Sequence, residues 1–258
     1  MSFVLKTLEK IIDFKIRSEA LVKNPISKYQ YAYSCGKSTE TALHSFIEEI
    51  ERSLQNDGFA ITIFLDIESA FDGCRFDVIE KAARDKEVPE WVIQWCKKML
   101  TSRQMIASNN GNSWFKPTQG VPQGGTGSPI LWNMVVDPLI NKLTDKVNLY
   151  DVDKTKVQAH VAGFADDMTT TVAGKKKNRR IVLHNANKAM TIVEEWCKSV
   201  GLSVNPSKTY AMIFTKGKVK WTLEKVKIFG QEIEYVESIK YLGVHIDCNL
   251  SWRPQIQN

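Results

Sequence analysis

The chain has 258 residues, of which 43% are hydrophobic and 25% are charged, the proportions of an ordinary globular protein. This composition excludes collagen, coiled coil and extended disorder, and no apolar run approaches the roughly 20 residues that span a bilayer. No basic and apolar leader opens the chain, and the five scattered cysteines show neither metal-ligand spacing nor a disulfide framework. We therefore expect one large or two small domains in an intracellular compartment, nucleus or cytoplasm, with no membrane contact and no disulfide-linked partner.

The net charge of +6 is unevenly distributed along the chain. Residues 175–225 hold 12 Lys or Arg and 3 acidic residues, so the rest of the chain is slightly negative. Charge polarised in this way is typical of proteins that bind a polyanion such as nucleic acid. A solvated lysine-rich surface is the simpler explanation of the charge taken alone.

Several stretches repeat their apolar residues with the spacing that is typical of amphipathic helices. These are residues 3–22, 39–54, 76–87, 90–100, 128–143 and 178–200. Gly201 directly follows the last stretch, in the position where a glycine commonly ends a helix.

Short apolar runs bounded by turn residues predict strands. These are residues 59–64, two strands within 157–172, then 209–215, 225–229, 232–236 and 241–246, with a hairpin at 101–119 around the turn NNGN. Because helices and strands do not alternate regularly, we predict an α+β fold rather than a doubly wound parallel sheet.

Three aspartates follow or join apolar strand-like runs. Asp166 and Asp167 lie between HVAGF and MTTTV, and Asp66 ends FAITIFL. Adjacent carboxylates resist joint ionisation unless a cation is near, although a polar β-turn explains Asp166 and Asp167 equally well. If the two segments are neighbours in one sheet, three carboxylates converge and suit two Mg²⁺ ions for in-line phosphoryl transfer.

The stretch GVPQGGTGSP, residues 120–129, combines glycines with a helix start at Ser128 and Pro129. Glycines allow a ligand to approach the backbone closely, and a helix N-terminus favours anions. The pattern is neither a P-loop nor GxGxxG, so a standard nucleotide-binding fold is not indicated. A plain glycine-rich connection is an equally good interpretation.

Five motifs, taken together, resemble those of reverse transcriptases. FLDIESAFD, GVPQGGTGSPILWN, FADD, GLSVNPSKT and YLGVHID occur in the order of that family. SFVLKTLEKIID and CGKSTETALH are similar to segments of non-LTR retrotransposon polymerases, particularly the jockey and R1 types of arthropods. The resemblance extends over essentially the whole chain.

The resemblance implies a right-hand polymerase, with a palm built on a small antiparallel sheet and with packed fingers. It places partial fingers at residues 1–58 and the palm at 59–215, with a fingers insertion at about 73–119. Residues 216–258 would end the palm with a primer-grip hairpin, and no thumb is expected in this chain.

The resemblance also implies roles for residues at the reaction centre. Asp66, Asp166 and Asp167 would hold two Mg²⁺ ions, with Mn²⁺ as an alternative, and Lys208 would protonate the leaving pyrophosphate. An exposed lysine at a strand edge is the alternative interpretation of Lys208.

Further residues match the family's nucleotide and primer sites. The resemblance implies that the incoming nucleotide is bound by the Ile67 carbonyl, Phe71, Gln123 and Gly124. The Phe71 ring would exclude a nucleotide with a 2′-hydroxyl. The resemblance assigns the primer grip to Tyr241, Leu242 and Gly243. A core aromatic explains Phe71 as well, and an ordinary buried strand explains the primer-grip segment equally.

The basic run at the start of the last long helix consists of Lys175, Lys176, Lys177, Arg179 and Arg180. It resembles a nuclear-localisation cluster, and it could also contact template–primer phosphates. A solvated loop is the favoured interpretation.

The implied function is RNA-directed DNA synthesis for retrotransposition, with an RNA template, a DNA primer and dNTPs as partners. The sequence departs from the family pattern at Gln119 and Gly127, and the first finger motif and a thumb are not found in it. We therefore expect a fragment with weak or no polymerase activity. The alternative is a non-catalytic nucleic-acid-binding remnant. A maturase would need a thumb and a basic tail, and a metal-dependent hydrolase would not explain PQG, Lys208 and YLG in sequence.

Overall fold

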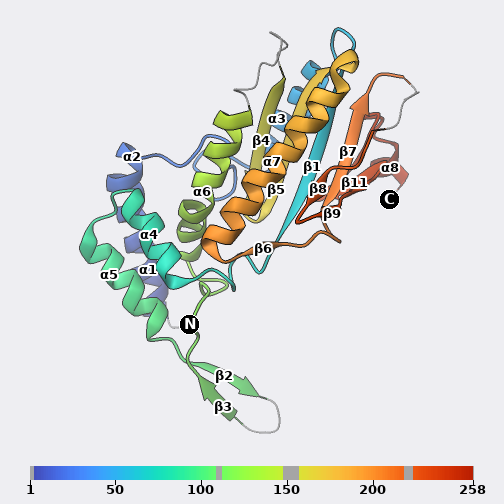
Figure 1. Ribbon diagram of the computed structural model, residues 1–258. Coiled ribbons are helices and arrows are strands. Elements are labelled where there is room, and N and C mark those ends of the chain that lie inside the picture. The colour runs from blue at the N-terminus through green and yellow to red at the C-terminus, as the bar shows by residue number, and fades with distance from the viewer. Residues whose placement is uncertain (1–2, 109–111, 148–156, 218–222, 258) are drawn as a thin grey trace. The chain divides into compact units, whose positions relative to one another are not determined.

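A computed structural model describes residues 3–108, 112–147, 157–217 and 223–257 (Figure 1). The chain divides into two compact units, between which it passes several times. Unit 1 consists of Met1–Ser27, Glu68–Pro138 and Ser199–Leu202; unit 2 consists of Lys28–Ile67, Leu139–Lys198 and Ser203–Asn258. The predicted α+β class is confirmed, whereas the boundaries proposed for fingers and palm stay a prediction.

Unit 2 contains a mainly antiparallel sheet. Its strands are β1 (Gly58–Glu68), β4 (Gln158–Phe164), β5 (Asp167–Lys175), β6 (Ser203–Val204), β7 (Tyr210–Thr215) and β10 (Glu234–Tyr235). Their order is β10-β7-β1-β5-β4, with β6 also paired to β1; the β7–β1, β1–β5 and β5–β4 pairs are antiparallel and the β10–β7 pair is parallel. The central position of β1 explains why its first eight residues are all buried.

The other elements of unit 2 surround this sheet. They are α3 (Thr39–Ser53), the last part of α6 (Ser128–Val147), the 3₁₀ turn η3 (Lys176–Asn178), most of α7 (Arg179–Val200), the strand pairs β8 (Lys227–Ile228) with β9 (Gln231–Glu232) and β11 (Ser238–Tyr241) with β12 (Val244–Asp247), and α8 (Arg253–Gln257). In Figure 1, α7 crosses one face of the sheet and α3 lies behind the opposite face. The sheet is therefore covered on both sides.

Alternation along β1 directs its side chains to these two faces. On the α3 face, Phe46 of α3 contacts the rings of Phe64, Phe214 and Tyr241 at centroid separations of 5.9, 6.2 and 5.6 Å. All four rings are buried, so aromatic packing joins α3, two sheet strands and β11 in one core cluster.

Local signals account for the ends of the long helices. The side chain of Ser38 accepts a hydrogen bond from Thr41 N, and Thr41 Oγ1 accepts one from Ser38 N, forming a capping box at the start of α3. Helix α7 ends at Val200, and Gly201 follows with φ +74°, as predicted.

Unit 1 is mainly helical. Its elements are α1 (Phe3–Lys15), the π-helical turn η1 (Ile16–Ala20), α2 (Leu21–Lys23), α4 (Phe76–Asp85), α5 (Glu90–Thr101), the hairpin strands β2 (Met105–Ser108) and β3 (Asn112–Phe115), and the first part of α6 (Ser128–Val147). The turn that the sequence predicts at NNGN falls mostly on residues 109–111, which lie outside the described residues.

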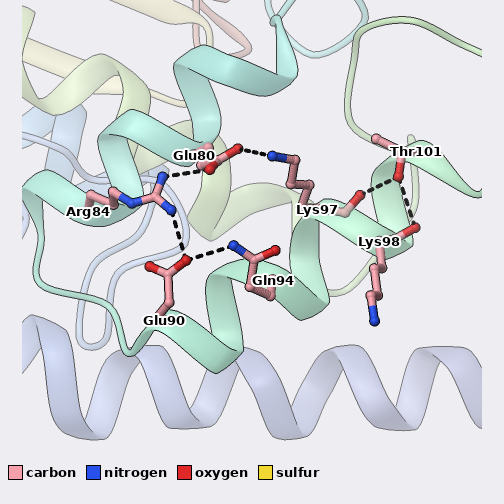
Figure 2. A network of polar contacts seen from close by, with 7 residues as sticks. All are labelled: Glu80, Arg84, Glu90, Gln94, Lys97, Lys98 and Thr101. Carbon is pink, nitrogen blue, oxygen red and sulfur yellow. Dashed lines mark hydrogen bonds and ion pairs between the residues drawn. The ribbon is translucent and has the colours of Figure 1, made fainter.

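A network of ion pairs joins α4 to α5 (Figure 2). Glu80 of α4 accepts from Arg84 at 2.6 Å and from Lys97 of α5 at 3.0 Å, while Glu90 accepts from Arg84 at 2.8 Å and from Gln94 at 2.7 Å. The hydrogen bond from Arg84, followed by that from Lys97, lowers the pKa of Glu80. Because these charges are close to solvent, the network fixes helix register more than it adds stability.

Several predicted elements differ from the structure, and among them the strand predicted at 232–236 is divided between β9 and β10. Residues 3–22 are helical as predicted, but the α-helix is interrupted between α1 and α2 by the π turn η1, in which Ile16 and Ala20 are buried. Residues 241–246 are two strands of a hairpin rather than one strand, since Leu242 and Gly243 adopt φ values of +47° and +84°. Helix α6 continues through Pro138 to Val147, beyond its predicted end at 143.

Within the described ranges, no helix is both long and apolar enough to cross a membrane. Each of the five cysteines, all of which are described, is a free thiol, and Cys74, Cys96 and Cys197 are buried. Burial raises the pKa of each of these three thiols to about 12.

His160 on β4 makes folding sensitive to acid. Its Nε2 lies 3.4 Å from Ser45 Oγ, its ring meets Tyr29 edge-on at 5.5 Å, and no described group bonds its buried Nδ1. Burial, followed by the charge of Arg52, lowers the pKa of His160 to about 4. His160 therefore stays neutral in the folded protein at pH values where the unfolded chain, with a histidine pKa near about 6.5, is already protonated.

We predict that the free energy of unfolding falls by about 1–3 kcal/mol as the pH drops from about 6.5 to 4, because only the unfolded chain is protonated in that window. Urea unfolding at pH 7 and pH 4.5 measures this loss. The variant His160→Phe keeps an aromatic ring but cannot titrate, so its loss should be smaller. An equal loss in both proteins would contradict the assignment.

Candidate active site

The carboxylates meet at one end of the β1–β5 ladder. The two strands pair without interruption from Gly58 opposite Lys175 to Asp66 opposite Asp167. Asp166 belongs to the two-residue connection from β4 to β5, in which Ala165 adopts a φ of +59°. The expectation that these segments are sheet neighbours is therefore confirmed.

Negative charge is concentrated at this end of the ladder. Asp66 is half-buried, whereas Asp166 and Asp167 keep much of their surface in solvent. Partial desolvation raises the pKa of Asp167, and the charges of Asp166 and Asp66 raise it further. Within the described ranges, no three His, Cys, Asp or Glu side chains stand together as a metal-binding group. The arrangement thus shows like-charge crowding that a cation would relieve.

The segment carrying Lys208 runs along the same end of β1. Asn205 N donates to Asp66 O at 2.9 Å, and Asp66 N donates to Thr209 Oγ1 at 3.3 Å. Lys208 itself is exposed, and its backbone N donates to Asn205 O at 3.2 Å. These bonds hold the Lys208 backbone beside Asp66, near the end of β1.

A cleft of about 170 Å³ opens between these residues and the β11–β12 hairpin. Its lining includes Asp66, Asp167, Lys208, Lys240 and Tyr241. The sheet register places Asp66, Asp167 and Phe64 on one face, and the Phe64 ring contacts Tyr241 at 5.5 Å. The hairpin therefore lies on the face of the sheet to which Asp66 and Asp167 belong.

The predicted primer-grip residues form the tight turn of this hairpin. Leu242 and Gly243 both have positive φ, which matches a type I′ connection and places a leucine in a conformation that costs energy. Tyr241 is buried, and burial raises the pKa of its hydroxyl, with the charge of Asp167 acting in the same direction. The Tyr241 side chain is therefore part of the core; contact of the segment with a primer stays a prediction.

Phe71, Gln123 and Gly124 belong to unit 1, where they lie on two segments joined by hydrogen bonds. Val121 N donates to Phe71 O at 2.8 Å, and Gly120 N donates to Cys74 O at 2.7 Å. The half-buried Phe71 ring packs on Trp132 at 5.7 Å. Phe71 and Gln123, which are both predicted to bind the nucleotide, therefore lie on two neighbouring segments of unit 1 that backbone hydrogen bonds join.

The exposed amide of Gln123 has a partner that the sequence analysis missed. Gln123 Nε2 donates to Asp72 Oδ2 at 2.9 Å. Both residues line an open cleft of about 800 Å³ in unit 1, together with Glu9 and Arg103. The position of Asp72 directly after Phe71 in FLDIESAFD was the available signal. Ile67, by contrast, lies in unit 2, where it follows Asp66 on β1 and is buried.

The basic run lies at the other end of the ladder from the carboxylates. Lys175 pairs with Gly58, so about 27 Å of strand separates it from Asp167 at about 3.4 Å per residue. Lys176 Nζ lies 3.2 Å from Asp57 Oδ1 and donates to Lys216 O at 3.0 Å. The structure therefore does not bring Lys175, Lys176, Lys177, Arg179 and Arg180 to the carboxylate site.

Comparison of the fold with solved structures identifies its class. The chain superimposes on telomerase from Candida albicans in complex with the TWJ fragment of telomeric RNA with a TM-score of 0.60 at 14% identity, covering 96% of this chain and 37% of that one. Apo telomerase from Candida tropicalis, truncated from its C-terminal domain, gives 0.59 at 13% identity, with 96% and 44% coverage. The architecture is therefore that of polymerase fingers and palm.

Sequence comparison gives the family. Residues 1–246 match the family described as reverse transcriptase (RNA-dependent DNA polymerase), and the chain belongs to it. It is 26% identical to the putative 115 kDa protein of the type-1 retrotransposable element R1DM of Drosophila melanogaster, over 97% of this chain and 22% of the relative. It is 24% identical to the RNA-directed DNA polymerase of mobile element jockey from the same fly, over 98% and 27%.

The resemblance to R1 and jockey polymerases of non-LTR retrotransposons is thus confirmed. The chain spans about a quarter of the length of the curated relatives that it matches.

We predict that Asp167→Asn stabilises the fold at neutral pH. The pKa of Asp167 is higher in the folded protein than in the unfolded chain, where it is about 3.9. Protonated Asp167 therefore contributes its full stabilisation below about pH 3.9, and this contribution is lost as the pH rises through the folded-state pKa. The amide removes the repulsion at pH 7, with a gain of about 0.5 kcal/mol because solvent screens the charges.

Thermal unfolding at pH 7 and at pH 3 measures this difference, with Asp85→Asn as a control that breaks only the exposed Lys81 ion pair. A gain that is the same at both pH values would contradict the prediction.

Proposed function

We propose that this domain transfers a deoxynucleotide from a dNTP to a primer 3′-hydroxyl under the direction of an RNA template. The observation that carries the proposal is the β1–β5 register, which sets Asp66 opposite Asp167 with Asp166 adjacent and Lys208 along the same cleft. Membership of the reverse transcriptase family supports the same reaction.

We further propose that Asp66, Asp166 and Asp167 hold two divalent cations. The donor set is entirely oxygen, as Mg²⁺ prefers, and crowding of the three charges is what a cation would neutralise. Bound Mg²⁺, or Mn²⁺ in its place, would supply charge neutralisation at the reacting phosphate.

The remaining roles fall to side chains and backbone of the chain. Lys208 would deliver a proton to the leaving pyrophosphate from its exposed ammonium. The Phe71 ring, held against Trp132, would exclude a 2′-hydroxyl, while Gln123 and Gly124 would face the incoming nucleotide. The Ile67 carbonyl would lie beside the cations, and the turn at Leu242 and Gly243 would support the primer end.

We infer that the partners are an RNA template, a DNA primer and dNTPs. A solved telomerase that shares the fold carries a fragment of telomeric RNA, which supports an RNA partner for this fold. The free cysteines fit a reducing compartment, and we propose the nucleus or cytoplasm as the site of action. Because the chain spans about a quarter of its relatives, we propose that its own polymerase activity is weak or absent.

One observation favours a second function, nucleic-acid binding without catalysis. The basic run from Lys175 to Arg180 lies about 27 Å along the ladder from the carboxylates, so its phosphate contacts would not need the catalytic end. Binding through these residues would weaken with salt and would survive loss of the carboxylates.

Primer extension on an RNA template with dNTPs and Mg²⁺ tests the proposal. We expect Asp166→Asn to lower the rate by about 10²–10³-fold, the scale on which removal of one preorganised charge-stabilising group acts. Asp85→Asn, with a carboxylate only in a surface ion pair, should leave the rate unchanged.

The same assay is run on a longer version that carries the flanking sequence of its own element. Activity in the longer version alone would show that this chain is an incomplete polymerase. If neither version extends a primer while both bind RNA in a salt-sensitive way, the binding function replaces the catalytic one.

Cation binding has a readout that does not need activity. We predict that millimolar Mg²⁺ raises the melting temperature of the wild-type chain by relieving the carboxylate repulsion, and raises that of Asp167→Asn by less. An equal rise in both proteins, measured by thermal unfolding with and without Mg²⁺, would place the ion elsewhere.

A further inference from the structure

The glycine-rich loop, residues 120–127, leads directly into α6 of unit 1. The first N–H groups of a helix have no partners within the helix, and its N-terminus carries partial positive charge. Such a place attracts an anion, and the sequence leaves open whether that anion is a ligand.

In the structure, a side chain of the protein binds the two N–H groups that directly precede the first residue of α6. Glu9 Oε2 accepts hydrogen bonds from Thr126 N at 2.6 Å and from Gly127 N at 3.3 Å. Glu9 comes from α1 and is only 1% exposed. An internal carboxylate therefore binds the last two loop residues before α6.

The loop is folded tightly around this carboxylate. Gly125 N and Ser128 Oγ both donate to Pro122 O, at 3.0 and 2.7 Å. A Cβ at Gly125 would come within 2.6 Å of Ser128 Oγ and 3.2 Å of Glu9 Oε2, so only glycine fits there. The path of the loop and the position of the carboxylate therefore depend on each other.

This loop also carries Gln123. Gln123 lies between Pro122, whose carbonyl closes the turn, and Gly124, whose φ of +77° a side chain would strain. Its amide reaches Asp72 Oδ2 at 2.9 Å. A change in the path of this turn would therefore shift Gln123 relative to Asp72.

Burial of the Glu9 side chain at this place costs free energy, and the gain from packing does not account for a carboxyl group there. No described group bonds its buried Oε1, and a carboxylate with an unpaired oxygen is less favourable than an apolar side chain of similar volume. Arg103 is the nearby cation: its pKa is lowered by burial, while the charges of Asp72 and Glu9 act in the opposite direction. A carboxyl group at position 9 is explained if the loop must be held in one shape.

We propose that Glu9 is a positioning residue for nucleotide binding, which acts by fixing the loop that presents Gln123. The inference rests on the proposed function in one respect, the role of Gln123 beside the incoming nucleotide. Its structural part, the dependence of residues 120–127 on Glu9, stands independently of catalysis.

Two substitutions separate positioning from folding. Glu9→Gln keeps an oxygen that can accept from Thr126 N and Gly127 N, whereas Glu9→Leu keeps the volume and removes both acceptors. The matched controls are Glu19→Gln and Glu19→Leu, because Glu19 is an exposed carboxylate in η1 whose ion pair is with Lys15. Thermal unfolding establishes that each variant is folded.

The first readout is amide hydrogen exchange of the peptide that spans residues 120–127. We expect faster exchange in Glu9→Leu and near wild-type exchange in Glu9→Gln, with no change in the Glu19 variants. Unchanged exchange in Glu9→Leu would overturn the proposal.

The second readout is steady-state primer extension in whichever version of the chain is active. We expect Glu9→Leu to raise KM for dNTP by about tenfold, the scale of one lost charge-assisted hydrogen bond, with a smaller effect on kcat and rescue by Glu9→Gln. A fall in kcat at constant KM, in a loop that exchanges faster, would mean a structural role only.

Failure of the polymerase proposal gives a different result. If no version synthesises DNA, protection of residues 120–127 by dTTP replaces KM as the readout. Weaker protection in Glu9→Leu than in wild type supports the role of Glu9, and equal protection, or none in either protein, contradicts it.

Discussion

The uninterrupted antiparallel pairing of β1 with β5 is the constraint on which the carboxylate site depends. It fixes Asp66 opposite Asp167 and, at the other end, Gly58 opposite Lys175. A slip of one residue would turn one strand's side chains to the opposite face, and the packing of Phe64 against Phe46 and Tyr241 on one face opposes such a slip. The same hydrophobic packing that stabilises the sheet therefore sets the geometry of its acidic end.

Core and site share residues on the α3 face of this sheet. Phe46, Phe64 and Tyr241 form an aromatic cluster, and Tyr241 also lines the cleft beside Asp167. The hairpin that carries Tyr241 turns at Leu242, in a conformation that leucine rarely adopts. Packing of Leu242 against the same cluster explains how that strained turn is kept next to the cleft.

In unit 1, the main structural constraint is the one that fixes the shape of the glycine-rich loop, residues 120–127. Such a loop has high conformational entropy, and the Glu9 carboxylate counters it by binding two of its N–H groups. Backbone bonds from Gly120 and Val121 to the segment after β1 hold the loop's other end. Gln123 is thus placed by contacts at both ends of the loop, and Asp72 orients its side chain.

The sequence by itself determined the helices and most strands, because their apolar periodicity is local, and its ordered motifs determined the family. It also identified Asp66, Asp166 and Asp167 as carboxylates at strand ends. Only the tertiary structure decided that Asp66 faces Asp167, that the basic run lies far along the ladder, and that Glu9 binds the last two loop residues before α6. These contacts join residues about a hundred positions apart, and their partners are selected by packing and charge in the folded chain, which no local pattern records.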